Sequence, residues 1–374
     1  MKAESQAVIS GAGTSEIGRR LGRDPQMLTV DAVLAAISDA GLSTADIDGL
    51  ATYPGAVGST PGITGAGIDD VRNLLGLRTR WHAGGNELAG QLGSVVNAIL
   101  AVAAGLANHV VCFRSVWEST AQQQAGDRTA LVAQSKRAEV QLSRPYGVGY
   151  ATYGALTMQR YLHESGSTRE QFAQLAVVSR ANAAGNPLAI YRDPITVDDY
   201  LGSRMISDPL CLYDCDVPID GAVAFVVSSA DSSALDPRRC IGIEAVGTAA
   251  GFEACSDMMW SRTDLTPRDV DVAEIYDGFT VYAVRWLEAL RLTPRNETGA
   301  FIEGGHRIAL DGKLPISTGG GQLSAGRLHG YGALLEACIQ LRGDGGARQV
   351  PRHPEVAVVT SGAENFTSCL LLTH

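Results

Sequence analysis

Lysine is nearly absent from this chain of 374 residues, although the chain holds 30 basic residues. The only lysines are Lys2, Lys136 and Lys313, which stand far apart in the sequence. A Schiff-base mechanism needs a lysine beside other active-site groups, so the sequence does not indicate that chemistry. The net charge of −10 argues against a nucleic-acid or anionic-membrane surface as the main partner.

Long hydrophobic runs are also missing. The most apolar stretch, 95–111, is interrupted by Asn97, Gly105, Asn108 and His109, and it is too short and too polar to span a membrane. The first eighteen residues contain no apolar segment of signal-peptide length. We therefore expect a cytoplasmic protein that does not bind membranes.

The cysteines lack the spacing of a metal site. Cys211 and Cys215 are four positions apart, but no second pair of cysteines or histidines with zinc spacing lies near them. An odd, scattered set is typical of reduced thiols, so we expect no metal and no cofactor held by this chain. The seven cysteines are Cys112, Cys211, Cys215, Cys240, Cys255, Cys338 and Cys369.

Strand and helix patterns alternate along the first part of the chain. Buried-strand patterns at 7–13, 47–51 and 109–113 are separated by helical patterns at 29–41 and 90–107. This alternation predicts the α/β class with a parallel sheet.

The pattern starts again after 229–239, a segment rich in Ser, Asp and Pro that is the best linker candidate. A strand pattern at 240–247 opens the second series, and strands close the chain. Because the chain is long for one hydrophobic core, we expect two similar α/β halves, 1–231 and 237–374, related by duplication.

A region of different character, 115–210, interrupts the first half. Its helical runs, 150–163 and 169–183, predict an inserted and mostly helical region over an edge of the sheet. We expect this insertion to shape the substrate pocket.

Three glycine-rich or polar segments carry the candidate chemistry. In the late loop 316–332, glycines before a predicted helix let backbone amides point at a bound group, near the positive end of the helix. A cation, an imidazole and a phenol follow within a few residues. The candidates of this loop are Gly319, Gly320, Gly321, Ser324, Arg327, His329 and Tyr331.

The other two segments are shorter. Glu274-Ile-Tyr-Asp-Gly-Phe279 places Tyr276 and Asp277 at a strand-to-helix junction, and Trp81–Gly93 brings Gly84 and Gly85 to another helix start. Each feature taken alone has a structural explanation, because such glycines commonly serve packing and such tyrosines are commonly half-buried.

Together these segments resemble the thiolase superfamily, in particular its sterol-carrier-protein-thiolase branch. Val8-Ile-Ser-Gly-Ala-Gly resembles its first strand, and Cys215-x-Val-Pro-Ile-Asp-Gly-Ala-Val-Ala resembles its strand before the linker. Ala273-Glu-Ile-Tyr-Asp-Gly-Phe is similar to its Glu-Leu-His-Asp-x-Phe segment. Thr318-Gly-Gly-Gly-Gln-Leu-Ser-Ala-Gly-Arg-Leu-His-Gly is similar to its Ser-Gly-Gly-x-Ile-Ser-x-Gly-His-Pro-x-Gly loop. The resemblance implies the thiolase fold, two βαβ-type halves in αβαβα layers.

The departures from the thiolase pattern concern its reactive groups. A thiolase holds a nucleophilic cysteine at the start of the long first-half helix, but here 86–92 contains no Cys, Ser or Thr. The histidine of the late loop is replaced by Arg327, followed by Leu328, and the histidine of the other motif is Tyr276. Covalent acyl transfer is therefore not expected.

The replacements resemble those of the thiolase-like aldolases that shorten steroid side chains. That resemblance implies a lyase that cleaves a β-hydroxyacyl-CoA by a retro-aldol reaction. The products would be a ketone or aldehyde and a short acyl-CoA, such as propionyl-CoA or acetyl-CoA. It also implies two essential tyrosines, matched here by Tyr276 and Tyr331.

The resemblance implies partners as well. It points to a small, separately encoded acyl-CoA-binding protein with a zinc ribbon and an oligonucleotide-binding-like fold. Thiolase folds usually dimerise through first-half strands, so we expect a homodimer carrying one small partner per subunit, a heterotetramer.

Retro-aldol cleavage needs a base for the hydroxyl proton and donors for the thioester enolate. A phenol is a poor base unless a cation stabilises the phenolate, and Arg327 is the candidate cation. We expect one tyrosine to be the base and the other to protonate the enolate carbon, without deciding which. Amides at Gly319–Gly321, and at Gly84-Gly85, are expected to bind the enolate oxygen.

Two other functions remain open. One is an acetyl-CoA acetyltransferase or thiolase that uses a displaced cysteine, for which Cys112, Cys338 and Cys369 are the candidates. The other is a non-catalytic acyl-CoA-binding subunit.

Overall fold

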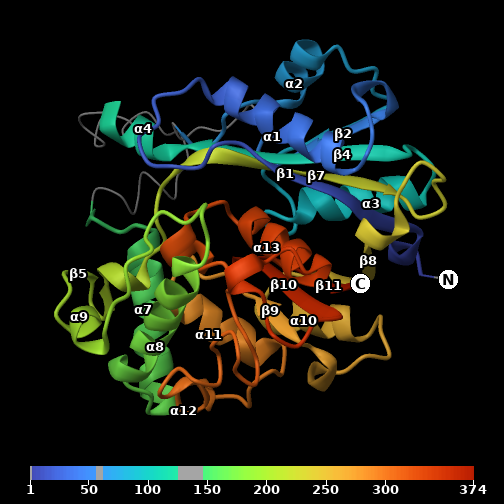
Figure 1. Ribbon diagram of the computed structural model, residues 1–374. Coiled ribbons are helices and arrows are strands. Elements are labelled where there is room, and N and C mark those ends of the chain that lie inside the picture. Colours follow the sequence, from blue (N-terminus) through green and yellow to red (C-terminus); the bar gives the residue numbers. More distant parts are fainter. Residues whose placement is uncertain (1, 56–61, 125–145) are drawn as a thin grey trace.

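A mixed nine-stranded sheet forms the centre of the described structure (Figure 1). The computed structural model describes residues 2–55, 62–124 and 146–374. The strand order is β3-β2-β4-β7-β1-β8-β11-β10-β9. These strands are β1 (Ala7–Thr14), β2 (Gly49–Thr52), β3 (Trp81–Gly84), β4 (His109–Trp117), β7 (Asp220–Ser229), β8 (Ile241–Gly247), β9 (Val272–Glu274), β10 (Val356–Ala363) and β11 (Phe366–Thr373).

The two ends of this sheet repeat one topology. In the first half β2 and β4 are parallel, β7 is antiparallel to β4, and β1 is antiparallel to β7. In the second half β9, β10, β11 and β8 repeat these directions in the same order. In the first half β3 pairs with β2 in parallel. In the second half a parallel bridge between Ala273 of β9 and Ile316 occupies the corresponding position. An internal duplication would produce this repeat, while the boundaries 1–231 and 237–374 stay a prediction.

The expectation of a parallel sheet is wrong, because each half contains antiparallel pairs. The chain leaves β4 at Trp117 and returns at Asp220, its partner in the ladder, so the insertion acts as a long hairpin loop. A connection that leaves and returns at the same end makes antiparallel neighbours. The direct hairpin from Ala363 to Phe366 has the same effect in the second half.

Helices enclose the two half-sheets in layers (Figure 1). On the outside of the first half lie α1 (Pro25–Asp39) and α2 (Ile68–Leu75), and α10 (Phe252–Trp260) and α11 (Thr280–Ala289) cover the second half. No helix among the described residues is long and apolar enough to cross a membrane.

Glycine in β1 allows α1 to approach the sheet closely. A Cβ at Gly13 would lie 2.2 Å from the backbone nitrogen of Ala36, and one at Gly11 would lie 2.3 Å from the Ala36 carbonyl oxygen. A larger residue at either position would therefore push the helix away.

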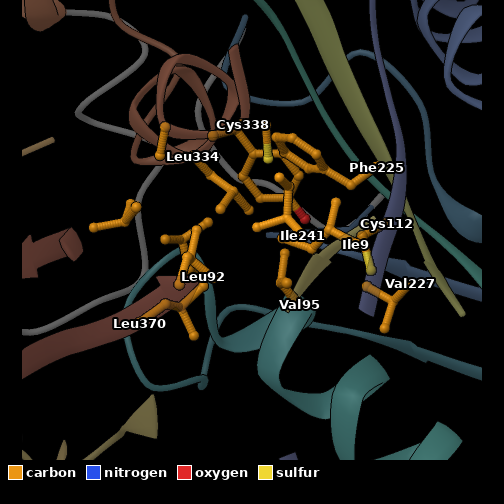
Figure 2. Close-up of a cluster of buried hydrophobic side chains, with 14 of the residues drawn as sticks. Ile9, Leu92, Val95, Cys112, Phe225, Val227, Ile241, Leu334, Cys338 and Leu370 are labelled. Atoms are coloured by element: carbon orange, nitrogen blue, oxygen red, sulfur yellow. The ribbon is translucent and has the colours of Figure 1, made fainter. Parts of the chain in front are cut away.

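The middle layer contains α3 (Gly93–Ala103) and α13 (Tyr331–Arg342), packed between the two half-sheets. Both halves contribute to its core, as the side chains of Ile9, Phe225, Ile241 and Leu370 in Figure 2 illustrate. On α13 the buried face follows the helical repeat, with Tyr331, Leu334, Ala337, Cys338 and Leu341.

The predicted insertion is largely helical where it is described. It contains α4 (Glu118–Gln124), α7 (Tyr150–Ser165), α8 (Arg169–Ala184), α9 (Val197–Leu201) and the small hairpin β5 (Met205–Ser207) and β6 (Leu210–Cys211). The helices expected at 150–163 and 169–183 are confirmed. The part of the insertion at 125–145 lies outside the described residues.

Replacing Leu334 by alanine tests the middle layer. We expect Leu334→Ala to lower the free energy of unfolding by about 2–5 kcal/mol, because this side chain is completely buried between the half-sheets. Leu100 lies on α3 and is 48% exposed, so Leu100→Ala is the control. It should change the free energy of unfolding by less than about 0.5 kcal/mol. Urea unfolding measures both, and equal effects would contradict the described packing.

Candidate active site

Tyr276 lies in the loop that joins β9 to α11. Its backbone N–H donates to Thr360 Oγ1 on β10, at 2.7 Å, which fixes the loop at the ends of two parallel strands. The side chain is partly exposed, and Gln91 lies close enough to the phenol to lower its pKa. A Cβ at Gly278 would lie 2.9 Å from the phenol oxygen, so glycine allows this ring its position.

Arg327 joins the late loop to the first half of the chain. Its guanidinium forms an ion pair with Glu118 at the start of α4, and Nη1 donates to Asp216 Oδ1 at 2.9 Å. Burial lowers the pKa of Arg327, but the two carboxylates more than offset this and keep the side chain charged. Burial also raises the pKa of Asp216 to about 6, against the effect of Arg327.

The surroundings of Tyr276 favour a neutral phenol. Burial, followed by the negative charge of Asp216, raises the pKa of Tyr276 well above its usual value, and Arg327 opposes both. Arg327 therefore lowers the pKa of the phenol, as expected, but burial and the charge of Asp216 raise this pKa by more. Tyr276 is protonated at neutral pH.

His329 follows Arg327 by two residues and has a left-handed backbone conformation, with φ of 52°. Its Nδ1 is 3.0 Å from Nη2 of Arg114, and its backbone N–H donates to Gln322 Oε1 at 2.9 Å. Burial and the charges of Arg114 and Arg327 lower the pKa of His329 well below its usual value. His329 is therefore a neutral imidazole.

Tyr331 occupies a different environment from Tyr276. Its side chain is completely buried at the start of α13, the phenol oxygen is 2.7 Å from Ser94 Oγ on α3, and the ring packs 5.6 Å from the Phe225 ring. Burial raises its pKa well above the usual value. Among the described residues no hydrogen bond joins the two phenols, although Arg114 lies close enough to lower the pKa of Tyr331.

A helix follows the glycine loop, as expected, but the loop forms a separate element before it. Gly321–Ala325 forms one π-helical turn, and α13 begins only at Tyr331. Positive φ values at Gly326 and Gly330, 129° and 81°, separate the two elements.

The insertion holds this loop in place through α8 and the residues that follow it. Asn186 Nδ2 donates to the carbonyl of Gly319 at 2.8 Å, and Arg180 Nε donates to Ser324 Oγ at 3.2 Å. The N–H of Gly320 donates to the Ser317 carbonyl at 2.8 Å, so this amide is not free to bind an enolate.

The Asp277 carboxylate also holds the late loop in place. It accepts the backbone N–H groups of Gln322 and Leu323, at 2.9 and 3.4 Å, and a Cβ at Gly321 would lie 2.1 Å from its carboxylate. Burial raises the pKa of Asp277 to about 7, against these two hydrogen bonds.

Gly84 and Gly85 lie elsewhere, at the exposed end of β3. A Cβ at Gly84 would meet Thr52 and Ile68, which belong to β2 and α2. From this part of the sequence it is Gln91, at the start of α3, that reaches the phenol of Tyr276. Ser361 on β10 fixes Gln91, because its hydroxyl accepts the Gln91 N–H at 2.9 Å and donates to Oε1 at 2.6 Å.

A largely apolar pocket adjoins Tyr276, Asp277, Gly319 and Gly321. Arg327 and His329 lie outside its described lining. An apolar pocket with a few polar groups suits an acyl substrate. Its hydrophobic wall includes Ile17, Leu188, Leu328, Leu335 and Ile339.

The sequence-based reasoning missed Arg114, Glu118, Asp216 and Gln91. Arg114 had a signal, since it is the only charged residue of β4 and is completely buried there. Asp216 stood at the unassigned position of the Cys215 motif. No local pattern distinguished Glu118, whose role depends on a partner 209 residues away.

The cysteines are poorly placed for nucleophilic catalysis. Cys112, Cys338 and Cys369 are buried, and burial raises the pKa of each thiol, to about 12 for Cys338. Cys215 lies nearest to Arg327, but burial and Asp216 raise its pKa as well. Among the described residues, no three His, Cys, Asp or Glu side chains are arranged to hold a metal ion.

Comparison with known proteins places these features in a family. Residues 241–371 match the family described as Thiolase C-terminal domain-like. A 17-hydroxy-3-oxo-4-pregnene-20-carboxyl-CoA lyase of Mycobacterium tuberculosis is 34% identical over 98% of this chain and 99% of its own. A steroid side-chain-cleaving aldolase of Thermomonospora curvata is 33% identical over 98% of this chain and 97% of its own.

Solved structures share the fold. The Ltp2-ChsH2(DUF35) aldolase superimposes with a TM-score of 0.87 at 31% identity, covering 100% of this chain and 98% of that chain. An acetyl-CoA acetyltransferase from Syntrophomonas wolfei, at 15% identity, has the same fold with a TM-score of 0.68 over 98% of each chain. The chain therefore belongs to the thiolase superfamily, in its branch of steroid side-chain-cleaving aldolases.

Proposed function

We propose that this protein cleaves a steroid-type β-hydroxyacyl-CoA by a retro-aldol reaction, giving a ketone or aldehyde and a short acyl-CoA. One observation carries the proposal: near the α3 start, where thiolases hold their cysteine, Gln91 instead lies close enough to the neutral phenol of Tyr276 to influence its pKa. This arrangement lacks a nucleophile but retains a proton donor. The names of the relatives, a steroid acyl-CoA lyase and a side-chain-cleaving aldolase, support the same reaction.

Tyr276 is suited to the protonation step. When the carbon–carbon bond breaks, its electron pair passes to the thioester enolate, whose carbon must then receive a proton. Tyr276 is protonated, partly exposed and at the pocket, so we assign this proton to its phenol. Gln91 and Arg327 then stabilise the phenolate that remains.

Tyr331 is the second tyrosine of the proposal, with the expected role of taking the hydroxyl proton. This role requires the phenolate form of Tyr331, because a protonated phenol cannot take up another proton; burial opposes the phenolate, and the charge of Arg114 favours it. Its complete burial and its contact with Ser94 mean that the phenol reaches a substrate only after it leaves Ser94. The two tyrosines therefore differ in access, and their removal should have different consequences.

We also propose that the protein works in the cytoplasm as a homodimer with one small partner of the DUF35 type per subunit. The similar Ltp2-ChsH2(DUF35) aldolase, whose name joins an aldolase chain to a DUF35 protein, supports such an association. At the end of the sheet, β3 has one unpaired edge among the described strands, and a second copy could pair there. Coenzyme A enters only as part of the substrate.

Tyr276→Phe tests the proposed proton donor. We expect kcat/KM to fall by about 10²-fold or more, the usual contribution of a positioned acid, with little change in unfolding temperature. Product mass spectrometry with a steroid β-hydroxyacyl-CoA, in the presence of the partner, measures the ketone released. Tyr282→Phe, a tyrosine on α11, is the matched control, and full activity in Tyr276→Phe would refute the assignment.

Tyr331→Phe and Ser94→Ala separate a reactive phenol from a structural one. If Tyr331 reacts, Tyr331→Phe should abolish cleavage while Ser94→Ala, which keeps the phenol, retains most of it. Loss of the shared hydrogen bond should cost each variant about 1 kcal/mol of unfolding free energy. If both variants lose the same unfolding free energy and both keep full activity, the role of Tyr331 is structural.

Cys215→Ala tests the alternative of a displaced thiolase nucleophile. We expect the variant to keep its cleavage activity, since burial and Asp216 hold this thiol in its protonated form. Intact-protein mass spectrometry after incubation with acetyl-CoA should detect no acyl-enzyme in either protein. An acyl adduct on the native protein that is absent from the variant would favour the thiolase.

A further inference from the structure

Arg114 is a buried cation that the proposed reaction does not use. It lies in the middle of β4 and is completely buried. Its Nη1 donates to the carbonyl oxygens of Tyr53 and Ser115, each at 3.2 Å, and to that of Ile63. These bonds to the first half fix the plane of the guanidinium and direct Nη2 toward His329.

The contact between Arg114 and His329 determines where the imidazole carries its proton. A guanidinium has only N–H donors and no acceptor, so His329 Nδ1, at 3.0 Å from Nη2, must accept the hydrogen bond. The neutral imidazole therefore carries its hydrogen on Nε2. Burial and the two neighbouring cations oppose a second proton, which agrees with this assignment.

On the other side of the ring, Nε2 faces a carboxylate at a distance too long for a hydrogen bond. Glu118 Oε1 lies 3.9 Å away, is buried, and has no hydrogen-bond partner among the described residues. The other oxygen of Glu118 is taken by Arg327. The two side chains are 11% and 7% exposed, and Oε1 itself has almost no accessible surface, so a hydroxyl group reaches it only after the side chains around it move.

A donor and an acceptor separated by this gap match one hydroxyl group. A hydroxyl oxygen about 2.8 Å from each atom accepts from Nε2–H and donates to Oε1, with roughly a right angle between the two bonds. A carbonyl would satisfy only the imidazole and would leave the buried carboxylate unpaired. The left-handed backbone of His329 is strained, as is common where a side chain must be held at a functional position.

We propose that Arg114 is a positioning residue that holds His329 as its Nε2–H tautomer, so that His329 and Glu118 together bind the β-hydroxyl group of the acyl-CoA substrate. The inference rests on the proposed function for the identity of the hydroxyl. The tautomer itself does not depend on that function. Arg114 acts through His329, whereas His329 and Glu118 would touch the substrate.

The tautomer is tested on the full-length protein by nitrogen NMR of ¹⁵N-labelled histidine. We expect the His329 signals, assigned by comparison with His329→Gln, to show a protonated Nε2 and an unprotonated Nδ1 at neutral pH. Arg114→Lys, which keeps the charge but loses the fork of donors, should weaken this preference. A protonated Nδ1 in the native protein would overturn the proposal whether or not the protein cleaves steroids.

A pair of variants tests the hydroxyl contact. The side-chain nitrogen of glutamine occupies about the same position as Nε2 of histidine and can donate in its place. The side-chain nitrogen of asparagine corresponds to Nδ1 of histidine and is too short to reach the hydroxyl group. In a Tyr276→Phe background that slows cleavage, we expect His329→Gln to bind the β-hydroxyacyl-CoA about as well as its parent. His329→Asn should bind about tenfold more weakly, a loss of one hydrogen bond.

The control ligand is the same acyl-CoA without the β-hydroxyl, which both variants should bind equally. If His329→Asn weakens both ligands alike, the hydroxyl contact is refuted while the tautomer stands. If the parent binds the hydroxylated ester with normal preference yet the native enzyme releases no ketone, the proposed function fails and the hydroxyl site remains.

Discussion

The ion pairs of Arg327 with Glu118 and Asp216 connect the parts of the site that lie far apart in the sequence. Arg327 belongs to the late loop of the second half, and both carboxylates belong to the first half. Burying three charges is costly unless they are paired with good geometry, so removing one partner leaves an uncompensated charge. This requirement fixes the late loop against the start of α4, and the position of His329 in that loop follows from it.

The same cluster explains how a thiolase framework can support chemistry without a thiolate. The charge of Arg327 lowers the pKa of the Tyr276 phenol, but burial and Asp216 raise it by more, so the phenol stays protonated while Arg327 partly offsets the cost of forming the phenolate. In the proposed reaction, the neutral imidazole and the neutral phenol present donors to a substrate oxygen or carbon. Electrostatic preorganisation replaces covalent attachment in this arrangement.

The sequence allowed prediction of most of the elements and of the two tyrosine motifs, because these depend on local periodicity and short spacing. The strand that begins at Ala7 and the helices that begin at Tyr150 and Arg169 start where the patterns indicated. Strand direction was missed, since it depends on where a connection returns. Arg114, Glu118 and Gln91 could not be assigned either, because each acquires its role from a residue more than 180 positions away.

Because β4 and β7 pair at Trp117 and Asp220, the segment between them leaves the ladder and returns to it at the same end. The entropic free-energy cost of bringing the ends of such a loop together rises by only about 0.6 kcal/mol for each doubling of its length. The length of this segment is therefore weakly constrained, whereas its packing is not, because Met158 and Phe172 share a buried core with Trp286 of the second half. The Ser179, Arg180 and Asn186 contacts with the late loop set the main condition, since any replacement must again support those turns. Diversification of substrate choice in this scaffold would then proceed by exchange of one module, with the reacting groups left in place.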